Sequence, residues 1–436
     1  MKKRYALILT FSMLVADHTA ALALAAPGDK IGPPTTHQTI GISLPGKVAW
    51  LLALKGGKKD TLLALMNSGV LYRIAPAGGK LRPERLLKTP KLSVKVPPID
   101  LGGDAIAGVA WGGSLLVIAL AKGVADRVLT SRELSPLSRP VFLSKNAIVA
   151  AGRKGSLILF EKKAGAWREA QKIPGAQALG DSILTAADID GDRQKELIVL
   201  AAPTERYGHG VLGDAIEPSE IRAYKLSGGR LGHMSTYQAG GAGVFEALGT
   251  LAADIDGDGR EEILVTRSDD ASGAAHLALS LRGGKLLLKA AGTAIGMGNR
   301  WSHLLGVHHM GKGKAQVLAI ETPHLAGYLL ALEQAGDNLS ERARRPGVST
   351  HTIGSRNLWQ HTVILRAGAH EIVVPKIGGR HLAALALKSG RWVSRWTIPL
   401  ASSLASNLVS GDFNEDGRAD LAFADEKGAV RMLLSK

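Results

Sequence analysis

Short apolar segments alternate with Gly-rich polar turns along most of the chain, as at residues 328–332 and 371–374. Most of these segments are about four to eight residues long, and no long stretch follows the 3.6-residue period of an amphipathic helix. Runs of this length, bounded by turn residues, are typical of β-strands. The pattern therefore predicts an all-β fold.

One segment with acidic residues at fixed positions occurs three times, at residues 186–199, 252–265 and 410–421. Each copy runs from an apolar strand through a tight acidic loop into a second apolar strand. With fainter copies included, we count about eight units at spacings of roughly 40 to 65 residues, close to the repeat lengths of β-propellers. The fainter copies and hairpins lie at residues 60–63, 105–120, 147–160, 307–318 and 371–374.

Four short strands per unit cannot bury both of their faces alone, so the units must stack face to face. We therefore predict a single β-propeller of four-stranded blades over residues 37–436, with seven blades and with eight as the alternative. The last unit stops one strand short after residues 428–434, while residues 38–44 form a lone strand before the first unit. The N-terminal strand is predicted to complete the last blade and close the ring.

The first 25 residues read as a secretory signal peptide. Three basic residues, Lys2, Lys3 and Arg4, precede an apolar run over residues 5–16 and a small-residue cleavage signal at residues 23–25. The run is shorter than the roughly 20 residues that a membrane span needs, so no membrane span is expected. We predict an exported chain, periplasmic or extracellular, with residues 26–36 as a linker.

The amino-acid composition excludes several kinds of site. The chain has no cysteine, which excludes disulfides, thiolate metal sites and cysteine nucleophiles. The formal net charge is +16, but the basic residues are scattered and aromatic residues make up only 4% of the chain. No nucleic-acid partner is expected from this pattern, and the protein is expected to be a monomer.

The three acidic loops have the chemistry of calcium sites. Oxygen ligands at positions 1, 3, 5 and 9, with a backbone carbonyl at position 7, form the kind of ring that Ca²⁺ prefers. Gly259 and Gly417 supply the sharp turn at position 6, where the first loop has Arg193, so the first loop is expected to be the weakest. The alternative is a set of solvated acidic turns. The predicted ligands are Asp188, Asp190, Asp192 and Glu196; Asp254, Asp256, Asp258 and Glu262; and Asp412, Asn414, Asp416 and Asp420.

These loops, each followed by apolar strand residues, resemble the FG-GAP or VCBS repeat of integrin-α-like propellers. The resemblance covers residues 180–436 well and the first part of the chain poorly. It implies a calcium-stabilised propeller, and propellers of that family often have seven blades, against the count of about eight. An EF-hand is excluded because position 12 holds Val199, Val265 or Phe423 where a bidentate Glu is needed.

The opposite end of the strands carries a second repeated pattern. The sequence N-x-W-x-H occurs at residues 299–303 and 357–361, each time just before a predicted first strand. The ends of second strands bring further polar groups to this face, including Arg267, Asp269 and Lys376. The predicted ligand-binding residues are Arg206, Tyr207, His209, Trp301, His303, His324, Trp359 and His361.

Two classes of function fit this face. The first is a noncatalytic binding or scaffold propeller for a carbohydrate, a protein or another polar partner, with the tryptophans as apolar platforms. The second is a secreted carbohydrate-active enzyme, a lyase or dehydratase, with His303 or His361 as base and Tyr207 or Arg206 stabilising negative charge. A third reading makes Trp301 and Trp359 packing residues between blades. No H-E-x-x-H or G-x-S-x-G motif is present.

Overall fold

The computed structural model describes residues 37–86, 92–121, 124–128, 132–310, 314–366 and 369–435. All regular structure in this part of the chain is β-strand, which confirms the predicted fold class. The predicted signal peptide and linker lie outside the described residues. Among the described residues there is no helix that could cross a membrane.

The described strands form four-stranded antiparallel units that follow one another along the chain. Blades 1 to 4 consist of β2 (Val48–Leu54), β3 (Thr61–Met66), β4 (Leu71–Ala77) and β5 (Lys80–Arg85); β6 (Ile99–Gly102), β7 (Ala105–Val109), β8 (Leu115–Ala119) and β9 (Val124–Val128); β10 (Val141–Ser144), β11 (Ala147–Ala151), β12 (Leu157–Lys163) and β13 (Ala166–Ile173); and β14 (Thr185–Ala187), β15 (Glu196–Thr204), β16 (Glu217–Ser227) and β17 (Arg230–Gln238).

The same order continues through the second half of the chain. Blades 5 to 8 consist of β19 (Leu251–Ala253), β20 (Glu262–Ser268), β21 (Ala275–Arg282) and β22 (Lys285–Ala291), preceded by the short β18 (Val244–Phe245); β23 (Ser302–His308), β24 (Gln316–Glu321), β25 (Tyr328–Ala335) and β26 (Asn338–Arg345); β27 (Thr362–Arg366), β28 (Ala369–Pro375), β29 (His381–Lys388) and β30 (Arg391–Pro399); and β31 (Val409–Gly411), β32 (Asp420–Ala424), β33 (Ala429–Ser435) and β1 (His37–Ser43).

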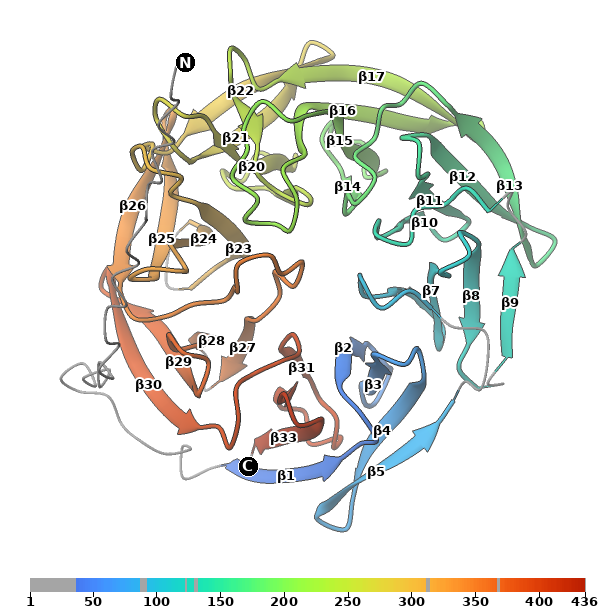
Figure 1. Cartoon of the computed structure of the whole chain (residues 1–436), viewed down its shortest axis with the longest axis vertical. Helices are drawn as coiled ribbons and strands as arrows, with labels where there is room; N and C mark the ends of the chain where they lie inside the picture. Colours follow the sequence, from blue (N-terminus) through green and yellow to red (C-terminus); the bar gives the residue numbers. More distant parts are fainter. Residues whose placement is uncertain are drawn as a thin grey trace, which may run out of the picture.

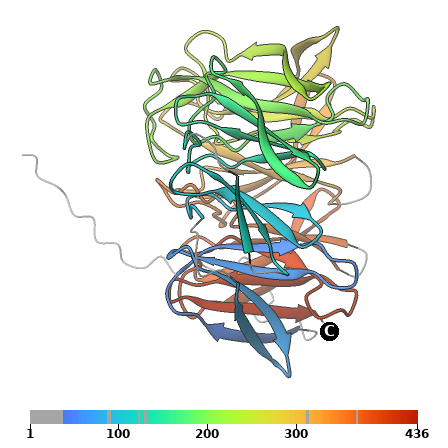
Figure 2. The ribbon, with the colours of Figure 1, turned by 90° about the vertical axis from the view of Figure 1, so that its right-hand side faces the viewer.

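The blades are arranged as a ring with the first strand of each blade nearest the centre (Figure 1). Seen from the side, the ring is a disc (Figure 2). Blades 5 and 6 are joined into one nine-stranded sheet only by a single parallel pair, Ala291 with Asn338, between β22 and β26. The described strands thus fall into eight four-stranded units.

The N-terminal strand closes the ring as predicted. β1 pairs antiparallel with β33 over seven residue pairs, from His37 with Ser435 to Ser43 with Ala429. It is the outermost strand of blade 8, whose other three strands come from the C-terminal end of the chain. Ile40 on this strand is buried in a cluster that also contains Leu51 of β2.

The core is divided among the contacts between neighbouring blades. Eight clusters of buried apolar residues each draw on two adjacent blades, and the cluster around Ile40 joins blade 8 to blade 1. Between blades 4 and 5, for example, Ile198 packs in the same cluster as Ile263. Apolar side chains on both faces of each sheet are buried in this way, which explains why the strands lack a consistent polar face.

Candidate functional site

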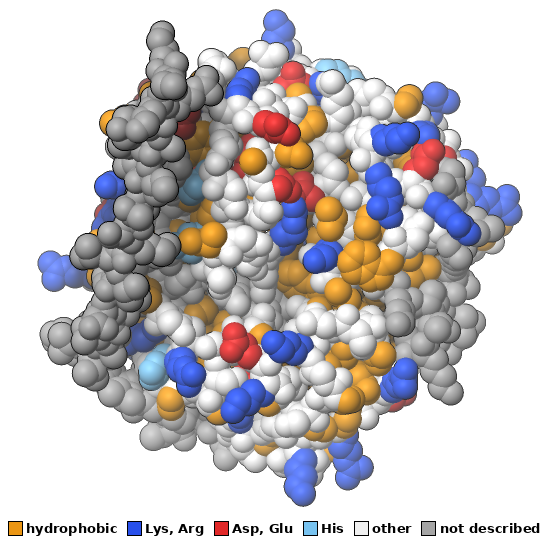
Figure 3. Space-filling view, in the orientation of Figure 1, with side chains coloured by type: hydrophobic (Ala, Val, Ile, Leu, Met, Phe, Trp, Pro, Cys, Tyr) orange, Lys and Arg blue, Asp and Glu red, His pale blue; other side chains and the backbone are white. Residues whose placement is uncertain are grey.

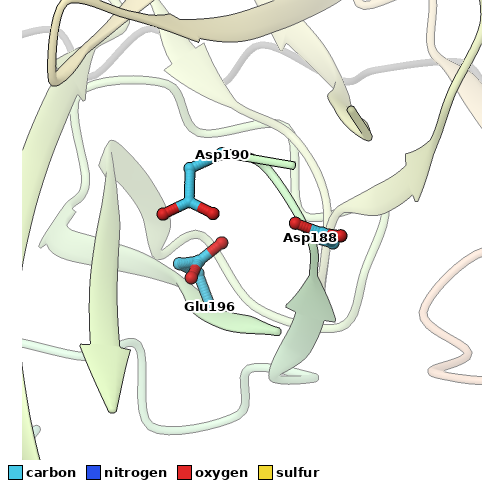
Figure 4. Close-up of side chains that lie close together, drawn as sticks. All are labelled: Asp188, Asp190 and Glu196. Atoms are coloured by element: carbon cyan, nitrogen blue, oxygen red, sulfur yellow. The ribbon is translucent and has the colours of Figure 1, made fainter. Parts of the chain in front are cut away.

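The acidic loops join the first and second strands of blades 4, 5 and 8. In the first loop, Asp188, Asp190 and Glu196 each place one carboxylate oxygen within 4.8 Å of the others (Figure 4). In the second loop, Asp254, Asp256 and Glu262 do the same. The acidic side chains of the third loop are not gathered this closely in the described structure.

The first and last ligand positions already have structural partners. Asp254 accepts hydrogen bonds from the backbone amides of Gly257 and Gly259, at 2.6 and 2.9 Å. Glu262 accepts one from the amide of Ile255 at 3.1 Å, across the base of the loop. The other two loops repeat this pattern, with Glu196 bonded to the amide of Ile189, and Asp420 to that of Phe413. The carboxylates therefore hold each hairpin in shape through backbone hydrogen bonds.

Lysine side chains enter two of the three loops. Lys225 of β16 contacts Asp190 and lies 2.7 Å from Asp192. Lys289 of β22 lies 2.5 Å from Asp256 and 2.6 Å from Glu262. The salt bridges of the described residues include no such lysine at Asp412, Asp416 or Asp420 of the third loop. One negative charge in each of the first two loops is thus balanced by a lysine within the protein, which the sequence spacing did not predict.

The loops fit a calcium ion unequally. Lys225 is 30% exposed, and Oε1 of buried Glu196 accepts no hydrogen bond and has only a 3.6 Å ion pair with this lysine. A calcium ion could therefore replace Lys225 at this oxygen. The side chain of Lys289 is only 4% exposed, so the second loop fits a metal poorly while this lysine is in place. In the third loop, Asp412 accepts hydrogen bonds from the amides of Asp416 and Gly417. Asp416 accepts hydrogen bonds from the amide of Arg418 and the side chain of Asn414, so in this loop the acids are held by hydrogen bonds and not by a lysine among the described salt bridges.

Backbone strain does not single out the first loop. Arg193 adopts a left-handed conformation with φ 67°, as expected from its place at position 6. Glu415 in the third loop has the same φ at position 4, where the other loops have Gly191 and Gly257. Each of these loops therefore carries one strained non-glycine residue, at a cost of about 1 kcal/mol.

Five of the eight predicted ligand-binding residues form one network of ring contacts and hydrogen bonds on the opposite side of the strands. The Trp301 ring stacks on His303, with centroids 4.9 Å apart, and lies nearly parallel to His324 at 6.1 Å. Nε2 of His324 is 2.8 Å from Nδ1 of His351. Burial lowers the pKa of His351 to about 4 and that of His303 well below its usual range, so both rings are neutral at pH 7.

The second half of this network lies in the long insertion between β15 and β16. Nδ1 of His209 contacts a carboxylate oxygen of buried Glu246, whose backbone carbonyl accepts a hydrogen bond from Trp301 at 3.1 Å. The Tyr207 ring lies 6.1 Å from that of His209, and its hydroxyl is buried without a partner. Burial and the nearby Glu246 raise the pKa of Glu217 to about 9, so this carboxyl is protonated at neutral pH.

The two N-x-W-x-H copies have different surroundings. Trp301 is 2% exposed and packs with Val211, Leu212 and Leu248, so its ring is part of the core. Trp359 is only partly buried, and its ring meets the edge of Trp50 at 5.5 Å. Of the two tryptophans, only Trp359 keeps surface that a ligand could contact.

Trp301, His303, Trp359 and His361 nevertheless line one cavity of about 410 Å³. The first strands and the connections that lead into them form much of its wall, so the cavity lies toward the ring axis. Figure 3 shows one face of the ring, where apolar side chains gather beside a central hollow and basic side chains are spread around the rim. The volume is in the range of small-molecule sites.

Three polar atoms of the cavity residues have no partner within the protein. They are Nδ1 of His303, Nδ1 of His361 and Oγ1 of Thr250. Nε2 of His361 is 2.7 Å from the carbonyl oxygen of Leu305, so this nitrogen carries the proton and donates it. Burial lowers the pKa of His361 to about 4, so the ring stays neutral and Nδ1 keeps a free lone pair.

A larger cavity of about 900 Å³ contains none of the predicted ligand residues. Exposed Trp111 and Ile216 lie in its wall beside Asp181 and Asp214. Both acids are paired with Arg356, the second at 2.8 Å. None of its lining side chains has a buried polar atom without a partner, so its polar groups do not require a ligand.

Arg206 is a predicted ligand-binding residue that lies outside the cavity, and three residues of this face were not predicted. Arg206 is exposed, and its guanidinium group donates to the carbonyl oxygen of Gly243 outside the cavity. Thr250, Glu246 and His351 were missed. Thr250 and Glu246 precede a first strand much as the N-x-W-x-H copies do, and that position was the available signal.

No family model and no curated protein matches the sequence. Among solved structures, the chain is similar to the crystal structure of Saccharomyces cerevisiae Sqt1, with 9% identity, a TM-score of 0.59, and coverage of 92% of this chain and 99% of that one. It is also similar to quinohemoprotein alcohol dehydrogenase from Comamonas testosteroni, with 12% identity, a TM-score of 0.54, and coverage of 91% and 76%. At these identities the likeness supports the β-propeller fold alone.

Proposed function

We propose that this protein is a noncatalytic binding propeller that holds a small hydroxyl-rich ligand, such as a carbohydrate, in the 410 Å³ cavity. The observation that carries the proposal is that Thr250, His303 and His361, three residues that line the same cavity, each have a buried polar side-chain atom without a partner. A buried polar atom without a hydrogen bond costs about 1–3 kcal/mol, which a ligand would recover.

The chemistry of these atoms favours a hydrogen-bond donor. Nδ1 of His361 can only accept, because Nε2 of this neutral ring donates to a carbonyl oxygen. Nδ1 of His303 and Oγ1 of Thr250 can each accept or donate, because Nε2 of His303 faces the hydroxyl of Thr350. Sugar hydroxyls supply such donors, while their C–H faces suit the apolar surface of Trp359. The partner is therefore a neutral polyol more readily than an anion.

The enzyme alternative receives less support from the same geometry. It requires Tyr207 or Arg206 close to a histidine base, yet neither lines the cavity that contains His303 and His361. Burial and neighbouring carboxylates also raise the pKa of Tyr207, which disfavours its ionised form. Binding without catalysis remains the function that we propose.

The wider setting is also a proposal. The signal-like N-terminus supports export to the periplasm or beyond, and the acidic loops support membership of the FG-GAP or VCBS group. We propose that the Asp188 and Asp412 loops hold calcium, which would supply a hard positive charge and stabilise their hairpins. Cell fractionation with N-terminal sequencing of the mature chain tests the export.

Screening on an array of mono- and oligosaccharides tests the binding. Wild-type protein should bind a restricted set of glycans, and His361→Ala should bind them about tenfold more weakly. His381→Ala is the matched control, because His381 is exposed on β29 away from the cavity. Equal binding by wild type and His361→Ala, with both proteins folded, would reject the cavity as the site.

A further inference from the structure

The second acidic loop is closed around a buried ammonium group. Lys289 comes from β22, the outermost strand of blade 5, and its side chain is 4% exposed. Its Nζ lies 2.5 Å from Asp256 Oδ2, 2.6 Å from Glu262 Oε1 and 3.9 Å from Asp258 Oδ2. Three of the four predicted calcium ligands therefore surround one lysine.

The ammonium and a calcium ion would compete for the same place. Calcium is held by oxygens at 2.3–2.6 Å, and Nζ lies about that far from the oxygens of Asp256 and Glu262. A metal bridging these two oxygens would have to displace Nζ. Because Lys289 is buried, its departure would also expose its aliphatic chain or strand its charge among apolar residues.

The corresponding lysine of the first loop, Lys225, also contacts two carboxylates, Asp190 and Asp192, but it is more exposed than Lys289. Lys225 is 30% exposed, and it stands 3.6 Å from Glu196 Oε1, beyond hydrogen-bonding distance. This lysine can turn into solvent without losing a buried environment. The two loops thus have similar acidic sequences but differ in how firmly the internal cation is held.

Blade 7 shows a similar arrangement, although it has no acidic loop of the calcium type. Glu371 of β28 occupies the place of Glu262 in its blade and is 1% exposed. Arg395 of β30 donates to Glu371 Oε1 at 3.0 Å, and Trp396 donates to Oε2 at 3.1 Å. Blades 5 and 7 thus share an outer-strand cation that faces this buried carboxylate, and in blade 7 the cation is present without the metal-ligand loop.

We propose that Lys289 is the permanent cation of the Asp254 loop, so that this loop does not bind calcium although its sequence is the most complete calcium motif of the chain. Lys225 is an exchangeable cation that calcium must displace from the Asp188 loop. Of the three similar loops, one is thus reserved for an internal lysine.

Counting bound calcium tests this assignment. Equilibrium dialysis with radioactive calcium should give the same number of ions for wild type and Asp256→Asn, because the loop is already filled. Lys289→Met should gain one ion per chain, and Lys289→Met with Asp256→Asn should lose it again. Lys285→Met is the matched control, since Lys285 is exposed at the start of the same strand.

Two results would overturn the proposal. One is the loss of an ion in Asp256→Asn, which would mean that the wild-type loop holds calcium. The other is a folded Lys289→Met protein with no additional ion. If Lys289→Met folds only when calcium is present, the ion has replaced the lysine and the proposal stands, while Asp256→Asn decides the wild-type state independently.

Discussion

Asp60 and Asp412 are joined by two hydrogen bonds that run in opposite directions. The amide of Asp60 donates to the carbonyl oxygen of Asp412 at 2.7 Å, and the amide of Asp412 donates to the Asp60 carboxylate at 3.0 Å. Glu261 and Asp188 form the same pair between blades 5 and 4, at 2.8 and 2.6 Å. These hydrogen bonds therefore link two of the acidic loops to the neighbouring blades. The pair formed by Asp60 and Asp412 links blade 1 to blade 8.

Replacing Asp60 should weaken this junction. Asp60→Ala leaves the amide of Asp412 without its acceptor, and the expected loss is about 1–3 kcal/mol of unfolding free energy. Urea titration followed by tryptophan fluorescence measures it. Lys59→Ala is the control, because its exposed salt bridge with Glu415 should contribute little. An equal free energy of unfolding for wild type and Asp60→Ala would show that the hydrogen bonds between Asp60 and Asp412 do not stabilise the protein.

Removing the N-terminal strand should open the ring. A chain that begins at Gly46 loses β1, its seven pairs with β33 and the buried side chain of Ile40. The exposed edge of β33 is then free to pair with other chains. We expect aggregation or loss of cooperative melting, measured by light scattering and calorimetry. A monomer that melts cooperatively near the wild-type temperature would contradict closure by β1.

The ring itself could be predicted from the sequence because the repeat places strands and turns at regular intervals. About eight units were counted from the hairpins, including blades 2 and 3, which have no acidic loop but whose apolar runs still alternate with Gly-containing turns such as that at Gly155. The predicted number was nevertheless seven, with eight as the alternative, whereas the described strands form eight four-stranded units. The N-terminal strand could be assigned to the last blade since one unit lacked a strand. These features depend on local patterns alone.

The site could be predicted only in part, because its details depend on contacts between distant segments. Trp301 was expected to be a platform, but the insertion that contains Val211 and Leu212 packs against it. Lys289 lies 27 residues beyond Glu262, and nothing in the loop spacing indicates that it turns back into the loop. Convergence of the histidines was predicted, while Thr250 was missed because a lone threonine has no sequence signature.

Calcium removal should lower the melting temperature. If the Asp188 and Asp412 loops bind calcium, saturating ion stabilises the folded chain by mass action, and EDTA should reduce the melting temperature by on the order of a few degrees. Asp412→Asn should remove part of this response. An identical melting curve with EDTA and with excess calcium would contradict calcium binding at both loops.

Glu217 should make the folded protein less stable as the pH rises toward 9. Its folded pKa is raised to about 9 from 4.5, so folding takes up a proton between these values. The stabilising contribution is complete below pH 4.5 and is lost as the pH rises toward 9, with a limiting slope of about 1.4 kcal/mol per pH unit. Glu217→Gln should flatten the dependence of unfolding free energy between pH 6 and 9.

Glu205→Gln is the control for this measurement, since Glu205 is exposed in the insertion that precedes β16. A pH dependence that is unchanged in Glu217→Gln would mean that this carboxyl is already ionised in the folded protein. Buried histidines affect the free energy of unfolding at acidic pH. Burial lowers the pKa of His276 to about 4, so the unfolded chain takes up a proton before the folded protein does, and stability is lost as the pH falls below 6.5.

Isothermal titration with the best glycan from the array most directly tests the central claim that the axial cavity binds a hydroxyl-rich ligand. Wild type should bind with little change between pH 5.5 and 8, because the pKa of His361 is about 4 and its ring stays neutral. Loss of one buried acceptor in His361→Ala should weaken binding about tenfold. Unchanged affinity in a folded His361→Ala protein, or the absence of any bound glycan for wild type, would contradict the account.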